Sequence, residues 1–282
     1  MFTLLNYLKF IRAGNCLLAA VGTLVGAYFT WLTPFYFEPI MTALAAFLVC
    51  AAGNIVNDLL DIEIDRINRP QRMLVKGVIS RTPAIKLAVA LTILSLVIGL
   101  LVNLAVFLSV VIALMLLALY NFKAKIIPVL GNLLIAALGS LTFITGGLAV
   151  DSSLTFVLPG PLIPAIFAFL FHLAREIVKD VEDIEGDRLN GVKTLPQIVG
   201  VSRALLAALG VFFVFSLASF VPVFQGWFGR TYEIIAVYLI DLPTLLLLIF
   251  IWGHPTPKML RTGSLVLKGG MVLGILALIL AR

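Results

Sequence analysis

Apolar residues run along this chain in long stretches that are separated by short polar segments. Each stretch is close to the roughly 20 residues that an α-helix needs to cross the hydrocarbon core of a bilayer. The stretches occupy residues 15–33, 39–57, 84–102, 104–121, 130–150, 161–179, 203–224, 232–252 and 263–281. The pattern therefore predicts an all-α integral membrane protein with nine transmembrane helices. Only Asn103 divides the third stretch from the fourth, so eight helices is the alternative count.

Composition agrees with a membrane protein. Of the 282 residues, 62% are hydrophobic and only 12% are charged, whereas soluble globular chains carry roughly 25% charged residues. Cys16 and Cys50 both fall within apolar stretches. This placement argues against a disulfide framework, and nothing resembles a metal-binding cysteine pattern.

The Lys and Arg residues predict the orientation. With the N-terminus in the cytoplasm and nine crossings, eighteen of the twenty basic residues fall on the cytoplasmic side, and only Arg230 and Arg282 fall on the other. This is a strong positive-inside bias, and an eight-helix count would break it. The net charge of +6 is explained by this bias and by anionic lipid headgroups, so no nucleic-acid partner is expected.

The acidic residues form the same pattern twice. Residues 57–68 read NDLLDIEIDRIN and residues 179–190 read KDVEDIEGDRLN, at an offset of 122 residues. Ten of the fourteen acidic residues lie in these windows or just before the second. The offset predicts that residues 1–282 form one membrane domain of two parallel four-helix repeats plus one helix. The repeat-like halves would cover about 1–125 and 126–250.

The spacing within each pattern predicts a cation site. At 100° per residue, Asn54, Asp58, Asp61 and Asp65 fall within about 60° of one helical face, and Glu176, Asp180, Asp183 and Asp187 repeat the spacing. Carboxylates so close repel one another. A divalent ion relieves this, and Mg²⁺ commonly pairs one or two carboxylates with substrate phosphates. We therefore expect the two motifs, facing each other, to hold Mg²⁺ and a diphosphate.

A solvated helix end, with its acids paired to nearby arginines, would explain one such motif. Two motifs that match at six positions favour a functional site, given the cost of ionisable groups near a bilayer. Basic side chains near the motifs are candidate phosphate ligands, Arg through bidentate contacts and Lys as a point charge. They are Arg72, Lys123, Lys125, Arg175, Lys179 and Lys193. For each of these residues alone, topology signalling is the competing interpretation.

The two motifs resemble the signatures of the UbiA-type intramembrane prenyltransferases. Asn57-Asp58-x-x-Asp61-x-x-x-Asp65 is similar to the first signature, and Asp180-x-x-Asp183-x-x-x-Asp187, followed by Gly191-Val192-Lys193-Thr194, is similar to the second. The resemblance extends to Arg12-x-x-Asn15, to the Tyr120-Asn121 pair and to Gly131-Asn132. It implies nine transmembrane helices, two Mg²⁺ ions and an allylic isoprenyl diphosphate donor.

The resemblance also implies roles for single residues. The implied Mg²⁺ ligands are Asn57, Asp61, Asp65, Asp183 and Asp187, and the motifs add Asp58 and Asp180 as catalytic residues. The candidate substrate-binding residues are Asn15, Arg69, Arg72, Tyr120, Lys123, Lys125, Arg175, Lys179 and Lys193.

Three further stretches, residues 15–19, 174–180 and 193–196, resemble the members that build archaeal-type ether lipids. The resemblance implies an enzyme of phospholipid biosynthesis in the cell membrane, with its active site facing the cytoplasm. It would transfer a geranylgeranyl group from geranylgeranyl diphosphate to a glycerol hydroxyl of geranylgeranylglyceryl phosphate, forming the second ether bond.

Two alternatives remain open. Residues 69–77 keep Arg69 and Arg72 but lack the Pro-Ser portion expected of those members. This loop bears on the acceptor, so prenylation of an aromatic acceptor in quinone, haem or chlorophyll biosynthesis is the alternative within the superfamily. An ion transporter is the alternative outside it. The carboxylates lie at the ends of the predicted spans, however, whereas transporter sites usually lie near the midplane.

Overall fold

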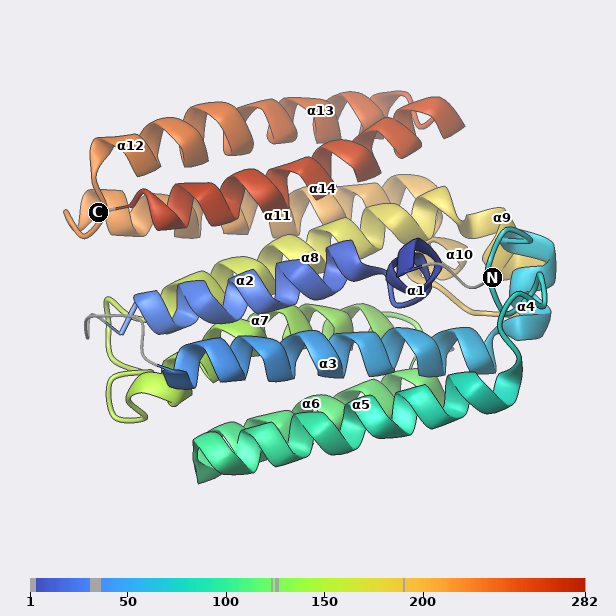
Figure 1. The fold of residues 1–282 in the computed structure, drawn as a ribbon. Helices are drawn as coiled ribbons and strands as arrows, with labels where there is room; N and C mark the ends of the chain where they lie inside the picture. The colour runs from blue at the N-terminus through green and yellow to red at the C-terminus, as the bar shows by residue number, and fades with distance from the viewer. Residues whose placement is uncertain (1–3, 31–36, 123, 125–126, 190, 282) are drawn as a thin grey trace. The chain divides into compact units, whose positions relative to one another are not determined.

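Helices make up the regular structure of this chain (Figure 1). The computed structural model describes residues 4–30, 37–122, 124, 127–189 and 191–281, and no strand occurs within those ranges. The helices divide by their contacts into two units. The first comprises residues 1–122 and 141–161, and the second comprises residues 123–140 and 162–282.

The first unit is built around the long helix α3. Its helices are α1 (Leu4–Phe10), α2 (Ala13–Tyr28), α3 (Phe37–Leu60), α4 (Ile62–Asn68), α5 (Arg81–Val102), α6 (Leu104–Phe122) and the second half of α7 (Leu130–Val150). α3 packs against α2, α5 and α6. Its alanines Ala45, Ala51 and Ala52 are fully or almost fully buried, because small side chains let helix backbones approach closely in a membrane protein.

Two glycines lie where the backbones of α2 and α7 approach each other closely. A Cβ atom on Gly26 would lie 2.0 Å from the carbonyl oxygen of Phe143. A Cβ atom on Gly146 would lie 1.8 Å from the carbonyl oxygen of Thr23. Since both obstacles are backbone atoms, no side-chain rotation relieves them. Glycine is therefore required at both positions by packing.

Asn103 separates α5 from α6, as the nine-stretch prediction requires. Its backbone is extended, with φ −170° and ψ 169°, so the helix cannot continue through it. Its side-chain oxygen accepts a hydrogen bond from the backbone N–H of Val106 at 2.8 Å, which caps the start of α6. Its amide nitrogen donates to the carbonyl oxygen of Leu148 in α7 at 3.0 Å.

The second unit contains the first half of α7 and the remaining helices. These are α8 (Leu162–Glu182), α9 (Ile184–Leu189), α10 (Leu195–Val199), α11 (Val201–Phe224), α12 (Arg230–Glu233), the π-helix η2 (Ile234–Asp241), α13 (Leu242–Gly253) and α14 (Pro257–Ile279). α8 packs against α11 and α14. Phe171 of α8 meets Phe212 and Phe215 of α11 with ring centroids 5.5 and 5.1 Å apart, in the edge-to-face geometry that aromatic pairs prefer.

Seven helices in the described ranges are long and apolar enough to cross a membrane. They are α3, α5, α6, α7, α11, α14 and the continuous segment Arg230–Gly253. Within the described ranges, each of the nine predicted stretches overlaps a helix. The other two helices are α2, which is shorter at 16 residues, and α8, which carries five charged residues near its end. Nine crossings therefore stay a prediction.

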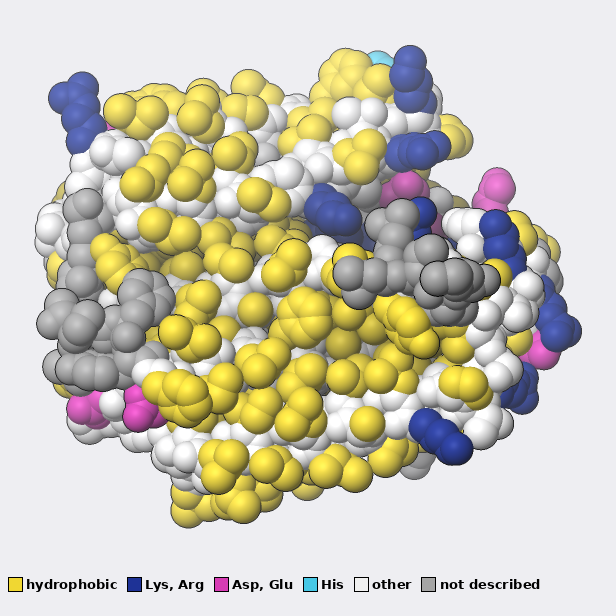
Figure 2. Space-filling model, in the orientation of Figure 1, with side chains coloured by type: hydrophobic (Ala, Val, Ile, Leu, Met, Phe, Trp, Pro, Cys, Tyr) yellow, Lys and Arg dark blue, Asp and Glu magenta, His cyan; other side chains and the backbone are white. Residues whose placement is uncertain are grey.

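Hydrophobic side chains cover much of the surface in Figure 2. On α5 and α6, Leu101, Leu104 and Met115 are 79%, 66% and 64% exposed. Apolar exposure on this scale marks a surface that contacts lipid or another protein. With the span lengths, it identifies a multi-pass membrane protein.

Candidate active site

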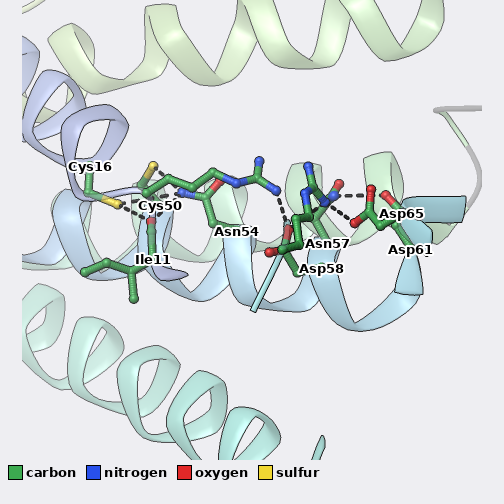
Figure 3. Close-up of polar contacts among 10 residues, drawn as sticks. Ile11, Cys16, Cys50, Asn54, Asn57, Asp58, Asp61 and Asp65 are labelled. Carbon is green, nitrogen blue, oxygen red and sulfur yellow. Dashed lines mark hydrogen bonds and ion pairs between the residues drawn. The ribbon is translucent and has the colours of Figure 1, made fainter. Parts of the chain in front are cut away.

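The first acidic motif lies where α3 ends and α4 begins (Figure 3). Asp58 is in the last turn of α3, Asp61 occupies the junction, and Asp65 lies in α4. The backbone of Asp61 has φ −97° and ψ 12°, in the sparsely populated bridge region where many active-site residues lie. The residues predicted to share one helical face are therefore divided between two helices. Backbone bonds from Asp61 N to Asn57 O and from Asp65 N to Asp61 O still connect the two helices.

Two arginines contact the aspartates of this motif. Arg12 forms an ion pair with Asp58. Arg72 donates to the same oxygen of Asp58 at 2.9 Å and also forms an ion pair with Asp65. The side chains of Asp58 and Asp65 are each only 6% exposed, and that of Arg72 is 12% exposed. Arg72 was predicted to bind substrate, and the structure places it between two buried carboxylates of the motif.

Arg12 reaches Asp58 from a strained backbone. It precedes α2 with φ 55° and ψ 54°, the left-handed region that residues other than glycine rarely occupy. Such a conformation costs of order 1–3 kcal/mol and persists where surrounding contacts determine it. Strain of this kind clusters at active sites and ligand clamps, which supports a functional role for this end of α2.

Burial sets the electrostatics of Asp65 and Arg72, both of which lie outside the membrane spans. Burial raises the pKa of Asp65 above its ordinary value, and the charge and hydrogen bond of Arg72 oppose the rise. Burial also lowers the pKa of Arg72, and its two aspartate partners oppose that fall. Each group therefore depends on the other to remain charged.

Arg72→Ala is expected to destabilise the ligand-free protein by about 3 kcal/mol, because it leaves Asp65 buried without its charge partner. This is the low end of the usual range for such a loss, since Arg12 still neutralises Asp58. Thermal unfolding of the purified protein measures the change. The matched control is Arg66→Ala, whose ion pair with Glu63 is exposed and should contribute less than about 1 kcal/mol. Equal losses in both variants would contradict the prediction.

The second acidic motif repeats the helix interruption of the first. α8 ends at Glu182 and α9 begins at Ile184, so Asp183 occupies the junction as Asp61 does in the first motif. Backbone bonds again connect the two helices, from Asp183 N to Lys179 O at 2.9 Å and from Asp187 N to Asp183 O at 2.9 Å. The two motifs therefore share local geometry as well as sequence.

Polar partners fix the deeper part of the second motif. Asp180, in the last turn of α8, accepts a hydrogen bond from the side-chain amide of Asn132 at 2.8 Å. One turn earlier, Glu176 is buried at 8% exposure. It forms ion pairs with Arg175 and, at 3.6 Å, with Lys179. Arg175 and Lys179, the two candidate phosphate ligands on α8, therefore both pair with the buried Glu176.

The donor atoms of the first motif suit Mg²⁺. The side-chain amide of Asn57 donates to Asp61 at 2.9 Å, so an amide and a carboxylate lie together at the end of α3. Across the described ranges, no group of three or more His, Cys, Asp or Glu side chains is placed to hold a metal. Arg72 lies between the carboxylates of Asp58 and Asp65, and Arg12 contacts Asp58. An ion that takes one or two carboxylates and completes its shell with phosphate oxygens and water needs no larger cluster.

The remaining predicted residues are spread over both units. Asn15 is exposed on α2, Arg69 follows α4, and Tyr120 is half-buried in the last turn of α6. Asp187 is half-buried in α9, and Lys193 is exposed between α9 and α10. The predictions for Lys123 and Lys125 fall outside the described residues.

Three polar residues of these clusters are named in the sequence analysis without a prediction of what they contact. They are Arg12, which pairs with Asp58, Asn132, which contacts Asp180, and Asn54, whose amide donates to the carbonyl oxygen of Ile11 at 2.9 Å. Each is a polar side chain in or near an apolar stretch, and this placement could have marked it as a candidate site residue. Only the fold identifies their partners, because those lie 43 to 48 residues away in the sequence.

Comparison with known proteins gives one consistent family. The model of the UbiA prenyltransferase family matches residues 17–280. Over 278 residues the chain is 36% identical to the digeranylgeranylglyceryl phosphate synthase of Thermococcus kodakarensis, covering 98% of this chain and 97% of that protein. It is 33% identical to the synthase of the same name from Haloquadratum walsbyi, covering 99% and 95% of the two chains.

Solved structures agree with the sequence comparisons. A structure of digeranylgeranylglyceryl phosphate synthase superposes with a TM-score of 0.80 at 33% identity, covering 99% of this chain and 98% of that one. A UbiA homologue from Archaeoglobus fulgidus, bound to DMAPP and Mg²⁺, gives a TM-score of 0.68 at 21% identity, with 97% and 99% coverage. At that lower identity the similarity concerns the fold.

Proposed function

Because this chain belongs to the UbiA prenyltransferase family, we propose that it transfers a geranylgeranyl group from geranylgeranyl diphosphate to a hydroxyl of geranylgeranylglyceryl phosphate. The new C–O bond is the second ether bond of an archaeal-type membrane lipid, and diphosphate leaves. The observation that carries the proposal is similarity over 98% of the chain to a digeranylgeranylglyceryl phosphate synthase. The paired aspartate motifs, each interrupted at its middle aspartate, support the chemistry.

The residues proposed to hold Mg²⁺ are Asn57, Asp61, Asp65, Asp183 and Asp187. Bound there, the metal would neutralise the charge that develops on the departing diphosphate. Asp58 and Asp180 act beside this set. Their contacts with Arg12 and Asn132 hold both carboxylates in position for binding.

Positive side chains are proposed to bind the phosphates of both substrates. The candidates are Arg69, Arg72, Arg175, Lys179 and Lys193, with Lys123 and Lys125 beyond the described residues and Asn15 and Tyr120 as hydrogen-bonding residues. Arg72 and Arg175 already hold carboxylates, so an incoming diphosphate exchanges one anion for another at each guanidinium. Such exchange costs less than burying a new unpaired charge.

The apolar helices are proposed to protect the reaction from water. Cleavage of the allylic C–O bond leaves a cationic carbon that water would trap. Long apolar spans such as α5 and α6 offer the prenyl tail a dry environment. We further propose nine crossings, two repeat-like halves at about 1–125 and 126–250, and both motifs on the cytoplasmic side. The positive-inside bias of the basic residues supports this orientation.

The proposal predicts Mg²⁺-dependent formation of a diether phosphate. Purified protein in lipid is supplied with radiolabelled geranylgeranyl diphosphate and geranylgeranylglyceryl phosphate, and labelled lipid is counted with and without EDTA. We expect product that disappears on chelation and returns with added Mg²⁺. Parallel reactions contain 4-hydroxybenzoate or dihydroxynaphthoate. A prenylated aromatic product alone would replace the acceptor assignment, and no product with any acceptor would reject the proposed reaction.

A further inference from the structure

Two cysteines from different helices of the first unit contact the side-chain amide of Asn54 (Figure 3). The side-chain nitrogen of Asn54 is 3.7 Å from the sulfur of Cys16 in α2 and 3.7 Å from the sulfur of Cys50 in α3. Both sulfurs therefore share one amide donor. Neither is in a disulfide. The fold has therefore brought together two thiols that are 34 residues apart in the sequence.

The surroundings distinguish the two thiols. Cys16 is fully buried, and its S–H donates to the carbonyl oxygen of Ile11 at 3.2 Å. Cys50, in contrast, is partly exposed. Partial exposure allows a reagent to reach the sulfur of Cys50. Cys50 is therefore the sulfur suited to react first, and Cys16 is placed to react second.

We propose that Cys16 and Cys50 form an oxidative modification site whose reagent is a hydroperoxide. The Cys50 sulfur attacks the peroxide and the O–O bond breaks. The Cys50 thiol proton goes to the departing oxygen, which leaves as water or an alcohol, and Cys50 becomes a sulfenic acid. The Cys16 sulfur then attacks the Cys50 sulfur, a disulfide forms, and the hydroxyl leaves as water with the Cys16 proton. The two thiols lose two electrons in total, and the peroxide gains them.

The disulfide would change the start of α2. An S–S bond is about 2.05 Å long, so the sulfurs must approach each other, and Cys16 loses the proton that it donates to Ile11. Ile11 directly precedes Arg12, whose left-handed backbone and contact with Asp58 define that end of the motif. Oxidation is therefore expected to displace Arg12 from Asp58 and to lower transferase turnover at least tenfold. This last consequence alone rests on the proposed function.

The chemical step is tested by counting thiols. Reduced protein in lipid is treated with hydrogen peroxide, denatured so that the buried Cys16 becomes accessible, labelled with a maleimide and analysed by mass spectrometry before and after a reductant. We expect both cysteines to escape labelling after peroxide, a peptide in which Cys16 is linked to Cys50, and full labelling after reduction. In Cys16→Ser, Cys50 should stop at a sulfenic acid that dimedone traps. Two free thiols after peroxide would overturn the proposal. So would the reverse order of reaction, in which dimedone labels Cys16 in Cys50→Ser but does not label Cys50 in Cys16→Ser.

The activity arm separates this inference from the proposed function. Peroxide should reversibly inhibit the wild type. The double variant Cys16→Ala/Cys50→Ala, measured in parallel, should stay active after the same treatment. A disulfide that forms without loss of activity would overturn the displacement of Arg12. Inactive protein in the reduced state would instead count against the proposed reaction, and the thiol count would still decide the modification site.

Discussion

Alanine at Asp61 is expected to lower the rate of prenyl transfer by about 10²–10³-fold, the range for removing one group that stabilises developing charge. Asp61 occupies the junction between α3 and α4 with a bridge-region backbone. Its carboxylate is held by the Asn57 amide at 2.9 Å. Removal of the carboxylate takes away one proposed Mg²⁺ ligand. The same loss is expected for Asp183→Ala, because Asp183 occupies the equivalent junction.

Initial rates across a Mg²⁺ titration provide the measurement, and circular dichroism verifies that helical content is unchanged. The matched controls are Glu63→Ala and Glu185→Ala, which remove an exposed acid two residues further along each motif. They should retain activity close to that of the wild type. If the controls lose as much activity as the junction variants, the motifs act through their total charge and the proposed ligand set is wrong.

Gly146→Ala is expected to cause the largest loss of stability in the first unit. The added methyl group would lie 1.8 Å from the carbonyl oxygen of Thr23, so α2 and α7 must separate along their contact. Overpacking of a core typically costs about 1–3 kcal/mol. A backbone obstacle should exceed that range, because rotation of a side chain cannot relieve it. Gly26→Ala should behave in the same way, since its Cβ would lie 2.0 Å from the carbonyl oxygen of Phe143.

Folded yield and the midpoint of thermal unfolding in detergent or lipid both report this loss. Gly14→Ala is the matched control in α2, because nothing lies within 4 Å of its added Cβ. That variant should be as stable as the wild type or slightly more stable, given the higher helix propensity of alanine. A normal unfolding midpoint for Gly146→Ala would show that α2 and α7 do not approach as closely as the structure places them.

Much of the fold follows from apolar spacing. The predicted stretch 130–150 coincides with α7, and 104–121 ends one residue before α6 does. Length and hydropathy suffice there because a spanning helix must satisfy its backbone internally. The extended backbone at Asn103 likewise confirmed the division of the third stretch from the fourth. Hydropathy is less decisive for α8, because this helix is long enough to span a membrane but also carries charged residues of the second motif.

The candidate site was predicted in composition but not in geometry. Repetition at a fixed offset identified both acidic motifs, since it needs no knowledge of the fold. The interruptions at Asp61 and Asp183 leave no trace in helical periodicity, because the i to i+4 backbone bonds continue across them. Arg12 could not be placed on Asp58 either, since its left-handed backbone is a tertiary effect that local preference opposes.

The single residue between α5 and α6 also orders events during synthesis of the chain. The oxygen of Asn103 meets the backbone of Val106 only three residues away, so this turn can close as soon as α6 begins to emerge from the ribosome. The amide nitrogen of the same side chain meets Leu148, which is synthesised 45 residues later. Because one residue is all that lies between α5 and α6, the local contact can close before its partner in α7 exists. Asn103 thus serves first as a local turn and afterwards as an anchor for the arriving end of α7.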